Sequence, residues 1–241
     1  MKGAAYNSTP VDRKGTGRIW EIDFFRGIAL VLMVFFHLLY DLKEFYGYPV
    51  SYNSGIFYYI GKASGILFII ISAISTGFSR NNRVRAGKFL TAALLITVAT
   101  HIYDPGFGIK YGILHFLGTC VLLYPLFRNI GQYSLALLGT VIIISGQYLG
   151  RLDIGHSYLF LFNLTGPGWT SADYYPLFPW LGVFFYGMAI EKILYPGRVS
   201  LIRFKPQRDF LSFIGRHTFL VYLLHQPVLL LVIGLYAVLT K

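Results

Sequence analysis

The chain has 241 residues, of which 55% are hydrophobic and only 13% charged, and its mean hydropathy is +0.58. A water-soluble domain carries about 25% charged residues. This composition therefore excludes a soluble globular protein and, with its long apolar runs, predicts an all-α integral membrane protein. The single cysteine, Cys120, excludes a disulfide framework and any cysteine-based zinc or iron–sulfur site.

Seven segments are candidates for membrane spans, since a helix that crosses the hydrocarbon core needs about 20 mostly apolar residues. In chain order they are 23–41, 57–78, 88–103, 110–127, 132–149, 174–194 and 210–238. The third is short, and the seventh contains Pro227, which leaves open whether it kinks or divides into two helices. We expect residues 1–22 to form a cytoplasmic segment without a cleaved signal peptide. Residues 23–241 are expected to form one transmembrane domain.

The net charge of +11 follows the expected loops. With the N-terminus in the cytoplasm, the cytoplasmic segments hold 14 of the 21 Lys and Arg residues and the outer segments hold 4. The positive-inside rule therefore predicts a cytoplasmic N-terminus and an outer C-terminus in a bundle of about seven helices. Because topology explains the basic surplus, no nucleic-acid partner is expected. The long outer segment 150–173 is expected either to cap a site or to anchor at the interface through aromatic residues.

The first span carries the densest set of ionisable residues: Asp23, Arg26, His37 and Asp41. At about 100° per residue, Arg26 and His37 share one face of the helix and lie about 16 Å apart along its axis. The two aspartates extend the same polar stripe. Ionisable groups at membrane depth are costly, so this stripe is expected to face the bundle interior or a water-filled cavity and to serve a function.

Two further histidines, His115 and His225, the latter beside Gln226, lie at depths that would let them meet His37 in the outer half of the membrane. Arginine gathers instead in the inner half, at Arg26, Arg80, Arg83, Arg85 and Arg216. Guanidinium groups suit phosphate, so the pattern predicts a ligand with phosphates at the cytoplasmic end and a reactive group near mid-membrane. Simpler readings stay open: topological signals for the loop arginines, an ion pair with Asp23 for Arg216, and a backbone contact for His115.

Four segments resemble the bacterial heparan-alpha-glucosaminide N-acetyltransferase-like membrane proteins. They are Arg18-Ile-Trp-Glu-Ile-Asp23-Phe-Phe-Arg26-Gly with Met33-Val-Phe-Phe-His37-Leu-Leu-Tyr-Asp41-Leu, Tyr111-Gly-Ile-Leu-His115-Phe-Leu-Gly, Pro179-Trp-Leu-Gly-Val-Phe-Phe-Tyr-Gly, and Ile214-Gly-Arg216-His-Thr-Phe-Leu-Val-Tyr-Leu-Leu-His225-Gln-Pro227. The wider superfamily includes acyltransferase family 3, whose first helix carries an arginine and a histidine at the spacing of Arg26 and His37. That family also has a cytoplasmic R-x-x-R motif, which Arg80-Asn-Asn-Arg83 resembles.

The resemblance implies transfer of an acyl group, most simply acetyl, from cytoplasmic acyl-CoA to a hydroxyl or amine of an extracytoplasmic glycan or glycolipid. His37 would act as general base or transient acyl carrier, and Asp41 would orient its imidazole. The guanidinium groups of Arg26, Arg80, Arg83 and Arg216 would hold CoA phosphates. His115, His225 and Gln226 would polarise the thioester or bind the acceptor, and Asp23 would position Arg26.

Residues 42–56 contain no histidine, although the lysosomal enzyme that names the family has its catalytic histidine in the loop after the first span. The role therefore passes to His37. No metal is predicted, and the expected surroundings are membrane lipids of a bacterial or archaeal cytoplasmic membrane. A proton-coupled transporter and a b-type haem protein stay as alternatives, because both also use polar residues inside the membrane.

Overall fold

The computed structural model describes residues 18–106, 108–152, 154–202 and 209–239, and within these ranges the chain is helical and forms no strand. Only an isolated bridge joins Tyr111 and Tyr174. The elements are α1 (Trp20–Glu44), α2 (Gly55–Phe78), α3 (Asn82–Tyr103), α4 (Ile113–Phe127), α5 (Gln132–Leu149), the 3-10 turn η1 (Phe160–Phe162), α6 (Leu177–Leu194), α7 (Phe210–Arg216) and α8 (Thr218–Leu239).

The predicted membrane bundle is confirmed, since six helices in the described part of the chain are long and apolar enough to cross a membrane: α1, α2, α3, α5, α6 and α8. The chain is thus a multi-pass membrane protein. The fourth expected span contains only the 15-residue α4, which at 1.5 Å per residue is about 22 Å long. The seventh divides into two helices, but at His217 rather than at Pro227, which lies inside α8.

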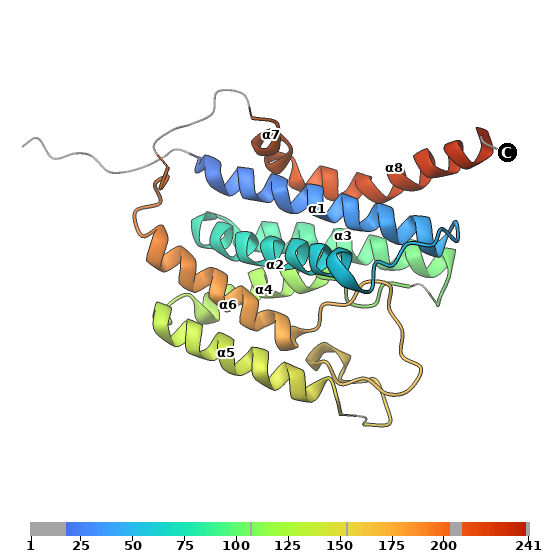
Figure 1. Ribbon diagram of the computed structural model, residues 1–241. Helices are drawn as coiled ribbons and strands as arrows, with labels where there is room; N and C mark the ends of the chain where they lie inside the picture. Colours follow the sequence, from blue (N-terminus) through green and yellow to red (C-terminus); the bar gives the residue numbers. More distant parts are fainter. Residues whose placement is uncertain (1–17, 107, 153, 203–208, 240–241) are drawn as a thin grey trace, which may run out of the picture.

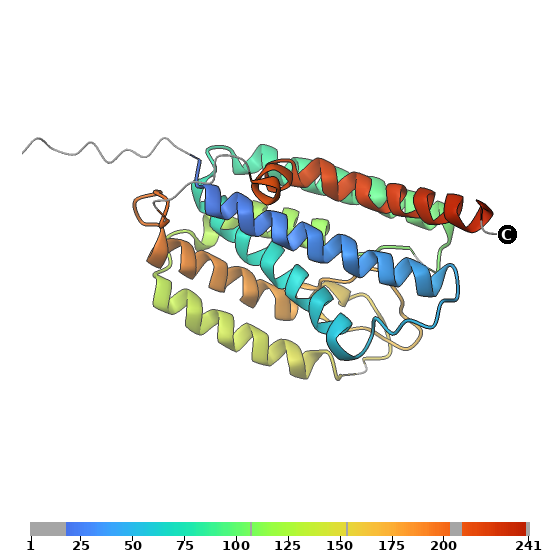
Figure 2. The ribbon, with the colours of Figure 1, turned by 45° about the horizontal axis from the view of Figure 1, so that its top comes forward.

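The long helices run roughly side by side, with α1 and α8 above α2 and with α6 and α5 at the opposite edge (Figure 1). Contacts follow the row α8, α1, α2, α6 and α5, and α3 packs with α4 against this row. Figure 2 shows the same row from a second direction, with α3 and α8 along one edge. Much of the apolar surface of α3, α5 and α8 is exposed, as expected of helices that face lipid.

The two ends of the bundle differ in the polar residues that lie there, and they are called the arginine end and the histidine end. The arginine end is where α1, α3 and α5 begin and α2, α4 and α6 end, and it also holds α7. The histidine end is opposite, where α1, α3, α5 and α8 end. The described parts of the connection between α5 and α6, residues 150–152 and 154–176, lie at the histidine end (Figure 1).

Residues of this connection complete the short α4. A carboxylate oxygen of Asp173 accepts a hydrogen bond from the backbone N–H of Ile113 at 2.9 Å, so it caps the first turn of α4. Tyr175 N–H donates to the carbonyl of Tyr111 at 2.9 Å, and Lys110 N–H donates to Ser171 Oγ at 3.1 Å. Because α4 is short, hydrogen-bonded backbone of residues 108–112 and 171–175 thus fills the part of the bundle length that α4 does not span.

Two glycines bring α7 onto the start of α1. A Cβ atom at Gly215 would collide with the carbonyl of Asp23, and one at Gly27 would collide with the carbonyl of Leu211. The backbones therefore touch in a way that no other residue allows at either position. This close approach puts the carbonyl of Gly215 within reach of Arg26, whose Nη1 donates to it at 3.3 Å.

Candidate functional site

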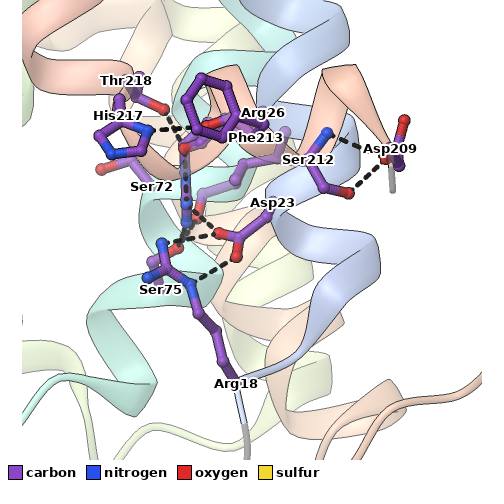
Figure 3. Close-up of polar contacts among 12 residues, drawn as sticks. Arg18, Asp23, Arg26, Ser72, Ser75, Asp209, Ser212, Phe213, His217 and Thr218 are labelled. Carbon is purple, nitrogen blue, oxygen red and sulfur yellow. Dashed lines mark hydrogen bonds and ion pairs between the residues drawn. The ribbon is translucent and has the colours of Figure 1, made fainter. Parts of the chain in front are cut away.

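The arginine end is organised around Asp23 on the first turn of α1. Its carboxylate is buried and accepts from two guanidinium groups, Arg18 Nε at 2.5 Å and Arg26 Nη1 at 2.6 Å. Figure 3 shows both arginines reaching Asp23, with Ser75 of α2 beside Arg26. Arg26 Nη2 donates to Ser75 Oγ at 2.8 Å. These bonds fix the Arg26 guanidinium between α1, α2 and α7.

A cavity of about 420 Å³ opens beside Arg26. Four cationic side chains lie on its wall: Arg26, Arg85, Lys88 and Arg216. Among the described residues that line it, none is acidic. Most of the remaining lining is apolar or aromatic, with Phe68, Ile71, Phe89, Ile113, Leu114, Leu117, Phe219 and Tyr222. The cavity thus combines a cluster of positive charge with a largely apolar wall that extends to Tyr222.

Arg85 is the best-anchored of these cations after Arg26. Its guanidinium donates to Thr76 Oγ1 and to Ser72 Oγ, both at 3.0 Å, and lies over the ring of Phe89, 5.3 Å from its centroid. Hydroxyl groups and an aromatic face leave its charge without a carboxylate partner. An anionic ligand in the cavity would supply one.

The other arginines chosen from the sequence are distributed unevenly. Arg216 lines the 420 Å³ cavity but does not pair with Asp23, whose oxygens are taken by Arg18 and Arg26. Arg80 lines a second, neighbouring cavity. Arg83 is exposed and lies on the wall of neither. Arg80 and Arg83 therefore do not line the same cavity in the structure, and Arg85, two residues further on, lines the 420 Å³ cavity instead.

At the histidine end, α1 and α8 bring together His37 and His225. Their rings meet edge to face with centroids 4.7 Å apart. His37 Nδ1 lies 2.9 Å from the carbonyl of Met33, and His225 Nδ1 lies 2.5 Å from that of Tyr222. A carbonyl only accepts, so each neutral ring carries its hydrogen on Nδ1. Both Nε2 atoms are then acceptors, able to take a proton.

Asp41 and Gln226 form the second pair at this end. The Asp41 side chain is fully buried, and its Oδ1 accepts from Gln226 Nε2 at 2.6 Å. The expectation that Asp41 orients His37 is wrong, because the hydrogen bond of the carboxylate goes to α8 and that of the imidazole goes to its own helix. Among the described residues, three buried acceptors here have no hydrogen-bond partner: Asp41 Oδ2, Gln226 Oε1 and His225 Nε2.

His115 does not join this group, so the expected meeting of three histidines is reduced to two. Its Nε2 lies 3.3 Å from Thr97 Oγ1, and its Nδ1 accepts from Gly112 N–H at 3.3 Å. It therefore links α3 to the start of α4. This corresponds to the simpler structural reading of His115.

Tyr222 connects the two ends. Its side chain lines the 420 Å³ cavity, its ring centroid is 5.4 Å from that of His225, and its carbonyl holds His225 Nδ1. The cavity that begins at Arg26 therefore reaches the residue that holds His225, one member of the histidine pair. In the sequence Tyr222 belongs to the Ile214–Pro227 segment that carries the family resemblance, but nothing singled it out as a site residue, because one tyrosine among 19 is unremarkable in a membrane protein.

Asp173 also escaped notice in the sequence, since it lies in an irregular connection. Burial raises the pKa of its carboxyl from 3.8 to about 6, although the N–H groups of Ile113 and Tyr174 favour the ionised form. Its hydrogen bond to α4 gives it a structural role. Among the described residues, no group of three or more His, Cys, Asp or Glu side chains is placed to hold a metal ion.

In a comparison with protein families, the profile described as heparan-alpha-glucosaminide N-acetyltransferase, catalytic, matches residues 18–227. That range includes the arginine end, the 420 Å³ cavity and both members of the histidine pair. No match was found among curated proteins or solved structures.

Proposed function

Because the chain belongs to the heparan-alpha-glucosaminide N-acetyltransferase catalytic family, we propose that it transfers an acetyl group from acetyl-CoA, bound at the arginine end, to an amine at the histidine end. The arginine end faces the cytoplasm in this proposal, and the acceptor is a glycan or glycolipid on the other side of the membrane. The observation that carries it is the cavity that runs from a wall of four cationic side chains to Tyr222, beside the histidine pair.

The donor fits the cavity by chemistry. CoA carries a pyrophosphate followed by a long, weakly polar pantetheine arm that ends in the thioester. Arg26, Arg85, Lys88 and Arg216 supply charge for the phosphates, with guanidinium groups that can donate paired hydrogen bonds. The apolar lining between Phe68 and Tyr222 suits the arm. Arg26 and His37 lie about 16 Å apart on α1, which is within the reach of an extended arm.

The acceptor end is rich in hydrogen-bond acceptors. Asp41 Oδ2, Gln226 Oε1 and His225 Nε2 are buried and have no donor among the described residues. Buried polar atoms are normally hydrogen-bonded, and an ammonium group offers three N–H donors together with a charge opposite to that of Asp41. A primary amine therefore matches this end better than a hydroxyl, which offers one donor.

In the reaction, an acceptor bound as its ammonium first releases one proton to water. The resulting neutral amine attacks the thioester carbonyl, a C–N bond forms, and the C–S bond of the collapsing intermediate breaks. The amine must lose a proton, which His37 Nε2 is in the correct tautomer to take. CoA leaves as a thiolate and becomes the thiol on protonation. His225 stands at ring contact with His37 and contributes a second acceptor for the amine.

A haem held between His37 and His225 does not fit this geometry. The two rings are in direct edge-to-face contact, and a porphyrin needs the space between its two axial ligands. His115 bonds to Thr97 and Gly112 instead.

The test uses detergent-purified protein with acetyl-CoA and glucosamine, followed by mass spectrometry. We expect N-acetylglucosamine and one equivalent of free CoA thiol for each product formed. A parallel reaction with glucose, which has no amine, is expected to yield much less product. Failure to bind acetyl-CoA, or amine-independent release of CoA as the sole reaction, would contradict the proposal.

A further inference from the structure

A second cavity, of about 360 Å³, lies beside the first at the arginine end. The two cavities share part of their walls, at Arg26, Ser75 and Ser79. The remaining lining of the second cavity is Arg18, Ile19, Ile22, Asp23, Phe78, Arg80 and Arg198. The Arg26 guanidinium, held by Asp23 and Ser75, therefore stands at the boundary between the two spaces.

The second cavity is strongly cationic. Four of its ten lining residues are arginines, and the carboxylate of Asp23 is already bonded to Arg18 and Arg26. The other two arginines have donors to spare. Arg198 commits one nitrogen, Nη2, to the carbonyl of Gly77 at 3.0 Å, and Arg80 makes no hydrogen bond or ion pair within the described part of the chain. Arg80 and Arg198 therefore bring two available guanidinium groups to one small space.

We propose that this second cavity is a subsite for the 3′-phosphate of CoA, and this inference rests on the proposed function. CoA is branched: the pyrophosphate continues into the pantetheine arm, whereas the ribose carries a separate phosphate monoester with a charge close to −2. In this arrangement the pantetheine arm lies along the apolar wall of the first cavity, and the pyrophosphate lies beside Arg26 and Arg85. The 3′-phosphate then needs a cationic site on the other side of Arg26, in the second cavity. Arg80 and Arg198 supply one.

The consequence is selectivity for CoA over its 3′-dephospho form. A charge-assisted hydrogen bond contributes enough to change affinity by about 10- to 100-fold, so the parent protein should bind acetyl-CoA at least about tenfold more tightly than 3′-dephospho-acetyl-CoA. Variants of the first cavity should weaken both ligands in parallel. Variants of the second should weaken only the phosphorylated one.

The experiment measures the dissociation constants of both thioesters by calorimetry, in detergent free of anionic lipid. Arg80→Ala is the principal variant, because this exposed side chain supports no other residue. Arg198→Gln removes the charge but keeps an N–H donor for the Gly77 carbonyl, so the conformation of the chain around residue 198 is expected to be preserved. Each is expected to weaken acetyl-CoA toward the affinity of the dephospho form, the double variant is expected to reach it, and the dephospho form should be unchanged in all of them. Arg128→Ala removes an exposed charge at the same end but outside both cavities, and serves as the matched control.

Equal affinity of the parent for the two thioesters would overturn the inference and leave the proposed function standing. So would a preference that survives both Arg80→Ala and Arg198→Gln. A repeat with phosphatidylglycerol tests the competing source of phosphate: if this lipid abolishes the preference through the same two arginines, the cavity is a lipid headgroup site and the inference is wrong. Failure to bind either thioester would overturn the proposed function as well.

Discussion

The arginine end and the histidine end of the bundle differ in how fully their buried polar groups are hydrogen-bonded. Arg26 and Arg85 each make at least two hydrogen bonds to serine, threonine, aspartate or backbone oxygens, so their charges are held in fixed positions. At the histidine end, three buried acceptors lack a donor within the described ranges of the chain. Satisfied groups give rigidity and a preformed binding site. Unsatisfied ones cost stability and are retained where a ligand or a reacting group completes them.

This contrast separates binding from chemistry. Changes at the arginine end should alter the affinity for acetyl-CoA, and changes at the histidine end should alter turnover or the affinity for the acceptor.

The largest effect is expected from His37→Ala. General base catalysis contributes about 10²- to 10⁴-fold, so acetyl transfer should fall by that factor while acetyl-CoA still binds. His217→Ala is the matched control, because His217 makes the same type of bond to the carbonyl four residues earlier but is exposed and lies outside the histidine pair. Steady-state kinetics and calorimetry on the same preparations check both. Parental turnover in His37→Ala would remove His37 from the mechanism.

Arg85→Ala should weaken acetyl-CoA binding by about 10- to 100-fold, because a charge-assisted contact in a desolvated cavity is lost. The rate at saturating acetyl-CoA should change little. Arg83→Ala should weaken binding about twofold at most, as expected of an exposed charge. The reverse order of the two variants would restore the R-x-x-R pair suggested by the sequence.

Asp41→Asn tests the other end. It keeps the volume and the contact with Gln226 but removes the negative charge, so the KM for an amine acceptor should rise by roughly tenfold. The dissociation constant of acetyl-CoA should be unchanged. If acetyl-CoA binding weakened instead, the division of labour between the two ends would be wrong.

A smaller effect concerns stability. Burial raises the pKa of Asp173 from 3.8 to about 6, so the folded protein retains this proton more tightly than the unfolded chain does. The associated stability is complete below about pH 4 and is lost as the pH rises through 6, by on the order of 2–3 kcal/mol. Thermal unfolding should therefore occur at a lower temperature at pH 7.5 than at pH 5. Asp173→Asn should reduce this difference, and an unchanged difference would assign it to other groups.

Much of this organisation was predictable from the sequence. Hydropathy located the helices, and the eleven-residue spacing placed Arg26 and His37 on one face of α1 because helical geometry is local. The partner of Asp41 was not predictable, since Gln226 is 185 residues away and only packing of α1 on α8 joins them. The choice between Arg83 and Arg85 also required the structure. Two residues apart on a helix means about 200° of rotation, so only one of them faces the cavity.

The central claim is that donor and acceptor reach one site from opposite sides of the membrane, with the arginine end in the cytoplasm. Sealed vesicles that expose the cytoplasmic face test it: acetyl-CoA is added outside, and a membrane-impermeant glucosamine oligomer is trapped inside. We predict acetylation of the trapped oligomer, and no product when donor and acceptor exchange sides. Product that forms only when both substrates share one side of the membrane would contradict this account.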